Sequence, residues 1–183
     1  MNILPCFAIA VLALARLPAS ANLAIFACEP EWAALAQELG GGSVVANSAT
    51  TGLQDPHHIQ ARPSLIALIR DADMIACTGA DREAGWLPLL LQRASNANIQ
   101  VSRPSHFIAT QYVKMLGIPQ HIDRSHRDVH AAENPHIQTS PANIFPVAKA
   151  MSQRFVQLDP SNLVVYEERM GDFEQRWRAA LAH

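Results

Sequence analysis

Short apolar segments alternate with amphipathic segments between residues 23 and 94, and this alternation restricts the fold more than any other feature. Apolar runs of strand length occupy 23–28, 43–46 and 73–77, and helical repeats of apolar residues occupy 30–39, 63–70 and 86–94. Strands that alternate with helices are typical of a parallel sheet. The sequence therefore predicts an α/β fold.

The second half of the chain is less regular. Residues 95–140 contain three prolines and five of the eight histidines, and we predict irregular structure there. Helical periodicity returns after residue 143. The sequence Asp159-Pro160 is typical of a helix start, and the helix that follows would span about 24 residues, or roughly 36 Å. Its apolar stripe consists of Tyr166, Met170, Phe173, Trp177 and Leu181.

Charge excludes one class of function. The formal net charge is −2, and the 14 basic residues are scattered along the chain. A nucleic-acid-binding protein normally carries a basic patch or stripe. The composition also offers no basic cluster for a charged membrane surface.

The first 21 residues resemble a secretory signal peptide. Residues 3–17 are almost wholly apolar, and Ala19-Ser20-Ala21 has the small residues of a cleavage site. The run is short for a membrane span. We therefore expect export to the periplasm with cleavage after Ala21; the alternative is a buried N-terminal strand or helix.

Two cysteines, Cys28 and Cys77, would remain in the exported chain. They could form a disulfide in an oxidising compartment. The alternative is two small buried hydrophobic side chains at strand ends, and we favour this interpretation.

Two histidines directly follow a proline and are candidate metal ligands. His57 lies in Asp55-Pro56-His57-His58, after the second apolar run, and His136 lies in Asn134-Pro135-His136. Ligands of open parallel sheets bind at the carboxyl ends of the strands, and proline stiffens the backbone before each imidazole. Neutral imidazole is a common zinc ligand. The alternative is a pair of loop histidines without a ligand role.

Several motifs together resemble the zinc- and manganese-type substrate-binding proteins of ABC importers. The resemblance covers roughly residues 23–183. The segments that carry it are 27–32 (ACEPEW), 50–58 (TTGLQDPHH), 63–64, 71–73 (DAD), 85–88 (GWLP) and 128–139 (DVHAAENPHIQT). Family members have two α/β lobes joined by a long rigid helix, with the metal between the lobes.

The resemblance assigns roles to individual residues. His57 and His136 match the two metal ligands of the N-terminal lobe, and His58 and His130 rank below them. Zinc is the expected metal, with manganese as the alternative. Glu83 matches an acidic residue near the family site, although an exposed helix carboxylate is the interpretation that we favour. His121 and His126 add to a short histidine cluster of the kind found in zinc-specific members, or lie in a solvated loop.

The resemblance also predicts the organisation of the chain. We expect a signal peptide at 1–21, a metal-binding lobe at 22–158 and the start of the connecting helix at 159–183, with the C-terminal lobe missing. The partner would be the permease of an ABC importer in the inner membrane. Without the second lobe, we expect the chain from about Gly171 onward to fray, or an otherwise monomeric protein to self-associate through the apolar stripe.

Two enzymatic functions are the alternatives. A small zinc-dependent hydrolase could use the same histidines, but the sequence has no His-Glu-x-x-His motif. A nucleotide-binding enzyme would need a glycine-rich loop after the first strand, where this chain has Glu29-Pro30-Glu31. We therefore predict a binding protein rather than an enzyme.

Overall fold

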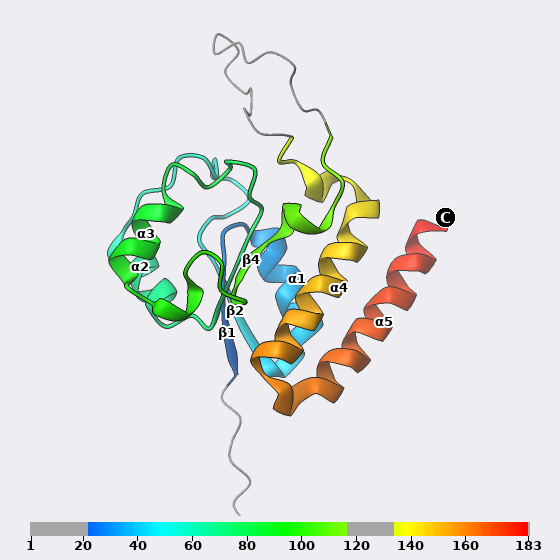
Figure 1. Cartoon of the computed structure of the whole chain (residues 1–183). Helices are drawn as coiled ribbons and strands as arrows, with labels where there is room; N and C mark the ends of the chain where they lie inside the picture. Colours follow the sequence, from blue (N-terminus) through cyan, green and yellow to red (C-terminus); the bar gives the residue numbers. More distant parts are fainter. Residues whose placement is uncertain (1–21, 117–133, 183) are drawn as a thin grey trace, which may run out of the picture.

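A four-stranded parallel sheet forms the centre of the molecule (Figure 1). The computed structural model describes residues 22–116 and 134–182. The strands are β1 (Leu23–Ala27), β2 (Val44–Ser48), β3 (Met74–Cys77) and β4 (His106–Ile108), in the order β2-β1-β3-β4. In register, Leu23 pairs with Val44, Ile25 with Met74 and Ile75 with His106. The predicted α/β class is confirmed, but β4 lies in a segment predicted to be irregular, because three residues are too few to show a period.

Within the part of the chain that the structure describes, five α-helices and several 3₁₀ turns connect and follow the strands. The α-helices are α1 (Pro30–Gly40), α2 (Pro63–Arg70), α3 (Leu87–Ala94), α4 (Pro141–Leu158) and α5 (Leu163–Leu181). The 3₁₀ turns are η1 (Gly41–Ser43), η2 (Ala97–Ile99), η3 (Ala109–Tyr112), η4 (Ile137–Thr139) and η5 (Pro160–Asn162). A proline occupies the first turn of each of the first four α-helices, where its missing N–H costs no hydrogen bond.

The sheet has a hydrophobic core on each face. Successive strand residues point to opposite faces, so Ile25 and Ala27 join the core under α1 and α4, whereas Phe26 and Cys28 join the core under α2 and α3. Burial on both faces explains why the central strands β1 and β3 are continuous apolar runs, whereas the edge strand β2 is partly exposed and ends in polar residues. The elements predicted from periodicity in the first half of the chain are confirmed on this basis.

Helix α5 corrects the prediction that the end of the chain lacks cover. After the turn η5, the helix folds back along α4 and continues to Leu181 without a break at Gly171 (Figure 1). Tyr166 is fully buried and Phe173 is 6% exposed, both in the core shared with α1 and α4. Leu181 is 54% exposed and remains outside this core. The first lobe thus covers most of the stripe, because a helix hairpin brings α5 onto it.

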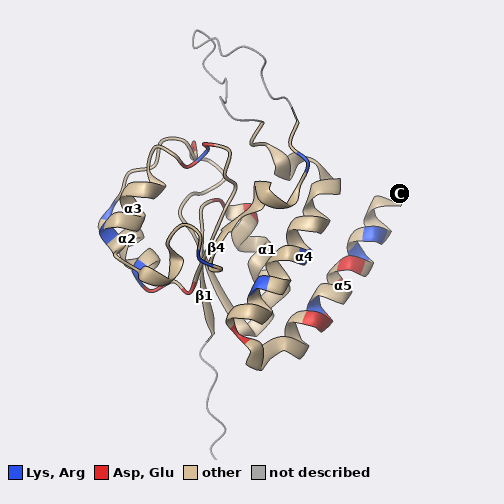
Figure 2. Ribbon diagram, in the orientation of Figure 1, with Lys and Arg blue, Asp and Glu red and all other residues tan. Residues whose placement is uncertain are grey.

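Helix α5 carries several exposed charged residues. Figure 2 shows acidic and basic residues alternating along this helix. Arg176 pairs with Asp172, and Arg178 pairs with Glu174, each across one helical turn. Arg176 also contacts Glu38 of α1. These ion pairs are exposed to solvent, so they contribute little to stability.

Two further predictions concern the membrane and the N-terminus. Among the described residues, no helix combines the length and the hydropathy that a bilayer span requires. The proposed signal peptide at 1–21 lies outside the described residues.

Candidate metal centre

The two Pro-His elements adopt the same local turn. In the first, the Oδ1 atom of Asp55 accepts a hydrogen bond from the backbone N–H of His57 at 2.9 Å. In the second, the Oδ1 atom of Asn134 accepts one from the backbone N–H of His136 at 3.0 Å. A side-chain oxygen that binds the backbone two residues ahead defines an Asx turn, and the intervening proline restricts it further. The sequence Asx-Pro-His thus presents both histidines on preorganised loops.

A single carboxylate holds two imidazoles in the first loop. The Nδ1 atom of His57 lies 2.8 Å from Oδ1 of Asp55, and the Nδ1 atom of His58 lies 2.9 Å from Oδ2. Three hydrogen bonds, led by that from the His57 backbone N–H, hold the pKa of Asp55 well below its usual range. An ionised carboxylate that accepts from Nδ1–H leaves Nε2 with the lone pair that a metal needs.

The two imidazoles differ in exposure. The His57 side chain is 31% exposed and its Nε2 atom is buried, whereas the His58 side chain is 82% exposed. His57 is therefore the more constrained of the pair. This difference agrees with ranking His57 above His58.

Trp86 anchors the loop to the body of the protein. Its indole Nε1–H donates to the carbonyl oxygen of Pro56 at 2.7 Å, and its ring is buried in the core under α2 and α3. Gly85 lies against the same loop, because a Cβ atom there would come within 3.3 Å of the His57 carbonyl oxygen. The segment before α3 therefore sets the position of His57.

The segment that carries His136 lies at the same end of the molecule as the carboxyl ends of the strands (Figure 1). Ile137 anchors it in the core with Phe107 and Ala109, and the side chain of Asn143 donates to the Ile137 carbonyl oxygen. The structure thus places His57 and His136 in loops at one edge of the sheet. His130, His121 and His126 lie outside the described residues.

A buried polar network lies beneath this edge and corrects the prediction for Glu83. Glu83 is 4% exposed, and its carboxylate accepts from the backbone N–H groups of Thr78 at 2.8 Å and Gly79 at 3.0 Å. Glu29 is 1% exposed and accepts from the Thr78 hydroxyl at 2.9 Å. Glu83 is therefore not an exposed helix carboxylate, because the turn after β3 folds it back over the strand end.

The network has two carboxyl groups and one guanidinium. Burial, followed by repulsion from Glu83, raises the pKa of Glu29 to about 9, and burial raises the pKa of Glu83 as well. Arg82 lies 3.8 Å from Glu29 and offsets part of the charge. Burial and the neighbouring carboxylate therefore favour the protonated form of Glu29 at neutral pH.

Cys28 and Cys77 form a disulfide, contrary to the interpretation that we favoured. Their Cα atoms are 4.8 Å apart, within the normal range for this bond. The strand order explains the pairing: β1 and β3 are neighbours, and the backbone N–H of Cys28 donates to Ala76 beside Cys77. The bond therefore joins the carboxyl ends of the two central strands below the histidine loops.

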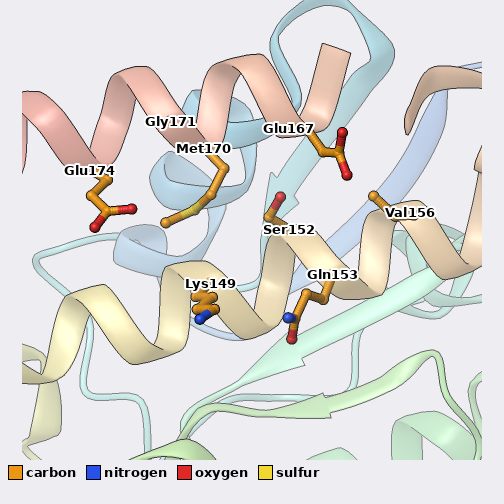
Figure 3. Close-up of a pocket in the computed structure, with 8 residues that line it drawn as sticks. All are labelled: Lys149, Ser152, Gln153, Val156, Glu167, Met170, Gly171 and Glu174. Atoms are coloured by element: carbon orange, nitrogen blue, oxygen red, sulfur yellow. The ribbon is translucent and has the colours of Figure 1, made fainter. Parts of the chain in front are cut away.

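A groove between α4 and α5 is unrelated to the histidines. Its volume is about 400 Å³, and Lys149 and Glu174 face it from opposite helices (Figure 3). Met170 supplies apolar lining. No histidine or cysteine of the described residues lines this groove, so it offers no set of zinc ligands.

Sequence reasoning missed the roles of Asp55 and Trp86. The pattern Asx-Pro-His contains the signal for the first, since Asp or Asn two residues before a histidine is typical of an Asx turn. Nothing local indicates that Trp86 donates to a carbonyl group 30 residues earlier. The pairing of Glu29 with Glu83 likewise depends on neighbouring strand ends.

Curated relatives of this chain are named as metal-transport proteins. The manganese ABC transporter substrate-binding lipoprotein PsaA of Streptococcus anginosus is 21% identical over 145 residues, which cover 78% of this chain and 44% of the relative. The metal ABC transporter substrate-binding lipoprotein SsaB of Streptococcus sanguinis is 20% identical, and the match covers 87% of this chain and 50% of the relative. The chain thus spans about half the length of these relatives.

Solved structures show the same fold. The Mn-bound periplasmic metal binding protein of candidatus liberibacter asiaticus superposes with a TM-score of 0.69 at 18% identity, over 86% of this chain and 54% of that one. A crystal structure of ZnuA superposes with a TM-score of 0.69 at 21% identity, over 86% of this chain and 55% of ZnuA. These likenesses confirm the parallel-sheet α/β fold.

The matching family model covers nearly the whole described chain. It spans residues 25–182 and describes a periplasmic component of a zinc-uptake complex. This is a family of transport components rather than enzymes, so the comparisons do not support the hydrolase alternative. The chain belongs to the ZnuA family, the periplasmic component A of the zinc-uptake complex.

Proposed function

We propose that this chain is the metal-capturing half of an exported substrate-binding protein that delivers zinc to an ABC importer. His57 and His136 are its two metal ligands. The observation that carries the proposal is the repeated Asx-Pro-His turn, which occurs in two loops at the same edge of the sheet. The transported ion is the cargo of the protein and not a cofactor.

The first loop has the outer contacts that a zinc ligand requires. Metal-binding histidines usually donate their second ring N–H to a carboxylate or carbonyl group, which fixes the tautomer. Asp55 accepts from Nδ1 of His57 in this way, which assigns Nε2 to the metal. His58 shares the same carboxylate but is far more exposed, so we assign it a secondary role. His130 remains a lower-ranked candidate.

Zinc is favoured over manganese by the ligand type. Imidazole suits zinc, whereas manganese sites contain more oxygen ligands. Relatives named for each of the two metals exist. PsaA is named for manganese, and ZnuA is named for zinc uptake. Two protein ligands leave coordination positions that water fills, so zinc binding by this chain is weaker than at a site with four protein ligands.

Partner and location follow from the family. A substrate-binding component acts outside the inner membrane, and its partner is the permease of the importer. Residues 1–21 would direct the chain to the periplasm and be removed after Ala21. We propose that the exported protein is a monomer. Its lobe at 22–158 binds the metal, and the helix from residue 159 onward connects this lobe to a further one.

Zinc titration of the purified full-length chain tests the ligand assignment. A fluorescent chelator of known affinity competes for the ion at neutral pH. His57→Ala and His136→Ala are each expected to abolish detectable binding, since either change removes one of the two assigned ligands.

A matched control is His106→Gln. This histidine lies in β4, and its Nδ1 atom contacts the Ile99 carbonyl oxygen rather than the candidate site. The control should bind zinc like the unmodified chain. Equal affinities in all three variants would contradict the assignment, and turnover of a chromogenic ester by the zinc-loaded protein would support the hydrolase instead.

A further inference from the structure

A second group of potential metal ligands lies in the interior, apart from the histidine loops. The Sγ atoms of Cys28 and Cys77 and a carboxylate oxygen of Glu83 all lie within 4.8 Å of one another. All three residues are buried. A tetrahedral zinc-type site with bonds of about 2.0–2.3 Å places its ligand atoms about 3.3–3.8 Å apart. Side-chain movements of about 1 Å would bring this group to that geometry.

The disulfide makes this group inactive toward metal. Sulfur binds zinc and cadmium as a thiolate, and neither sulfur of a disulfide carries that charge. Reduction releases two thiols on neighbouring strands whose Cα atoms are 4.8 Å apart. The hydrogen bonds along β1 and β3 keep the strand ends together, so the thiols stay beside Glu83.

Charge and access both suit a divalent cation. Two thiolates neutralise one divalent ion, so the two sulfurs and the ion would together bury no net charge, as buried ions require. Arg82 lies 3.8 Å from Glu29 and pairs with this neighbouring carboxyl group. A pocket of about 240 Å³ has Glu83 in its lining, so one ligand already borders an opening.

We propose that reduction of the Cys28–Cys77 disulfide converts this group into a thiolate site for a soft divalent cation. A thiol or phosphine reductant supplies two electrons, the Sγ–Sγ bond breaks, and each sulfur takes up one proton. The reductant leaves as a disulfide or, with oxygen from water, as a phosphine oxide. The cation then displaces both thiol protons to solvent and binds the two sulfurs, one Glu83 oxygen and a water molecule.

Cadmium titration of the full chain tests this proposal, because thiolate-to-cadmium charge transfer absorbs in the ultraviolet whereas imidazole and carboxylate sites lack that band. A Cys6→Ala background removes the third cysteine. The phosphine-reduced protein should develop the band up to one equivalent of cadmium, and the oxidised protein should show none. Circular dichroism verifies that the reduced protein is folded, and thiol alkylation verifies that both cysteines are reduced.

Variants separate this site from the histidine site. Cys28→Ser with Cys77→Ser should lose the band and retain zinc binding, and His57→Ala should retain the band under reduction. Glu83→Gln should weaken cadmium binding at least about tenfold. A reduced, folded protein without the band overturns the proposal, as does unfolding upon reduction or a band in the oxidised protein. Unchanged affinity in Glu83→Gln removes that residue from the ligand set.

Discussion

Asp55 offers the sharpest test of how the protein prepares His57 for a metal. Its carboxylate accepts three hydrogen bonds, one from the backbone N–H of His57 and one from Nδ1 of each of His57 and His58. Asp55→Ala removes all three. Asp55→Asn keeps the Oδ1 atom and its two bonds to His57, but it removes the negative charge and the acceptor for His58.

The expected size of the effect follows from this difference. Loss of an outer-shell partner typically lowers metal affinity about 10- to 100-fold. We expect Asp55→Ala to weaken zinc binding about 100-fold, because the turn and the tautomer are both lost, and Asp55→Asn to weaken it about tenfold. Asn134 already supports the equivalent turn before His136, so the turn should survive the second change.

Competition against a zinc chelator measures both affinities at neutral pH. Asp71→Ala is the matched control, since Asp71 is an exposed carboxylate that ends α2. The Asp55 side chain is 57% exposed, so thermal unfolding should change little in any of these proteins. An Asp55→Ala affinity within threefold of the unmodified chain would refute the reasoning, because the carboxylate would then do nothing for His57.

Three other changes test the surrounding structure. Phe173→Ala should reduce the free energy of unfolding by about 3–5 kcal/mol in urea, since the ring is 6% exposed; a negligible loss would restore the prediction that this end frays. Because burial raises the folded-state pKa of Glu29 from 4.5 to about 9, the folded protein retains a proton that the unfolded chain releases between these pH values. Stability should therefore fall as the pH rises through this window, by at most about 1.4 kcal/mol per pH unit. The free energy of unfolding, measured with urea from pH 5 to 9, should depend less on pH in Glu29→Gln, and an equal dependence in both proteins would exclude the raised pKa of Glu29. Trp86→Phe keeps an aromatic ring but loses the hydrogen bond to the Pro56 carbonyl oxygen, so zinc titration should show about tenfold weaker binding. Unchanged affinity would mean that the loop needs no anchor.

The sequence by itself determined the parts of the molecule that depend on local rules. Continuous apolar runs with intervening helical repeats correspond to β1, β2 and β3 and to α1, α2 and α3. Burial on both faces of the parallel sheet requires such runs in the central strands β1 and β3. Proline marks the first turn of each of these helices. The two Pro-His elements likewise marked both histidine loops, because proline restricts the backbone of its own short segment.

The tertiary structure alone decided which distant residues meet. Cys28 and Cys77 are 49 residues apart in sequence, and only the strand order places them side by side. Glu83 is buried because the turn after β3 folds back over the strand end, and a single carboxylate in a polar stretch carries no sign of that. The cover of Phe173 depends on a hairpin between α4 and α5. Each outcome rests on contacts between elements, whereas periodicity and turn chemistry report only on the residues within one.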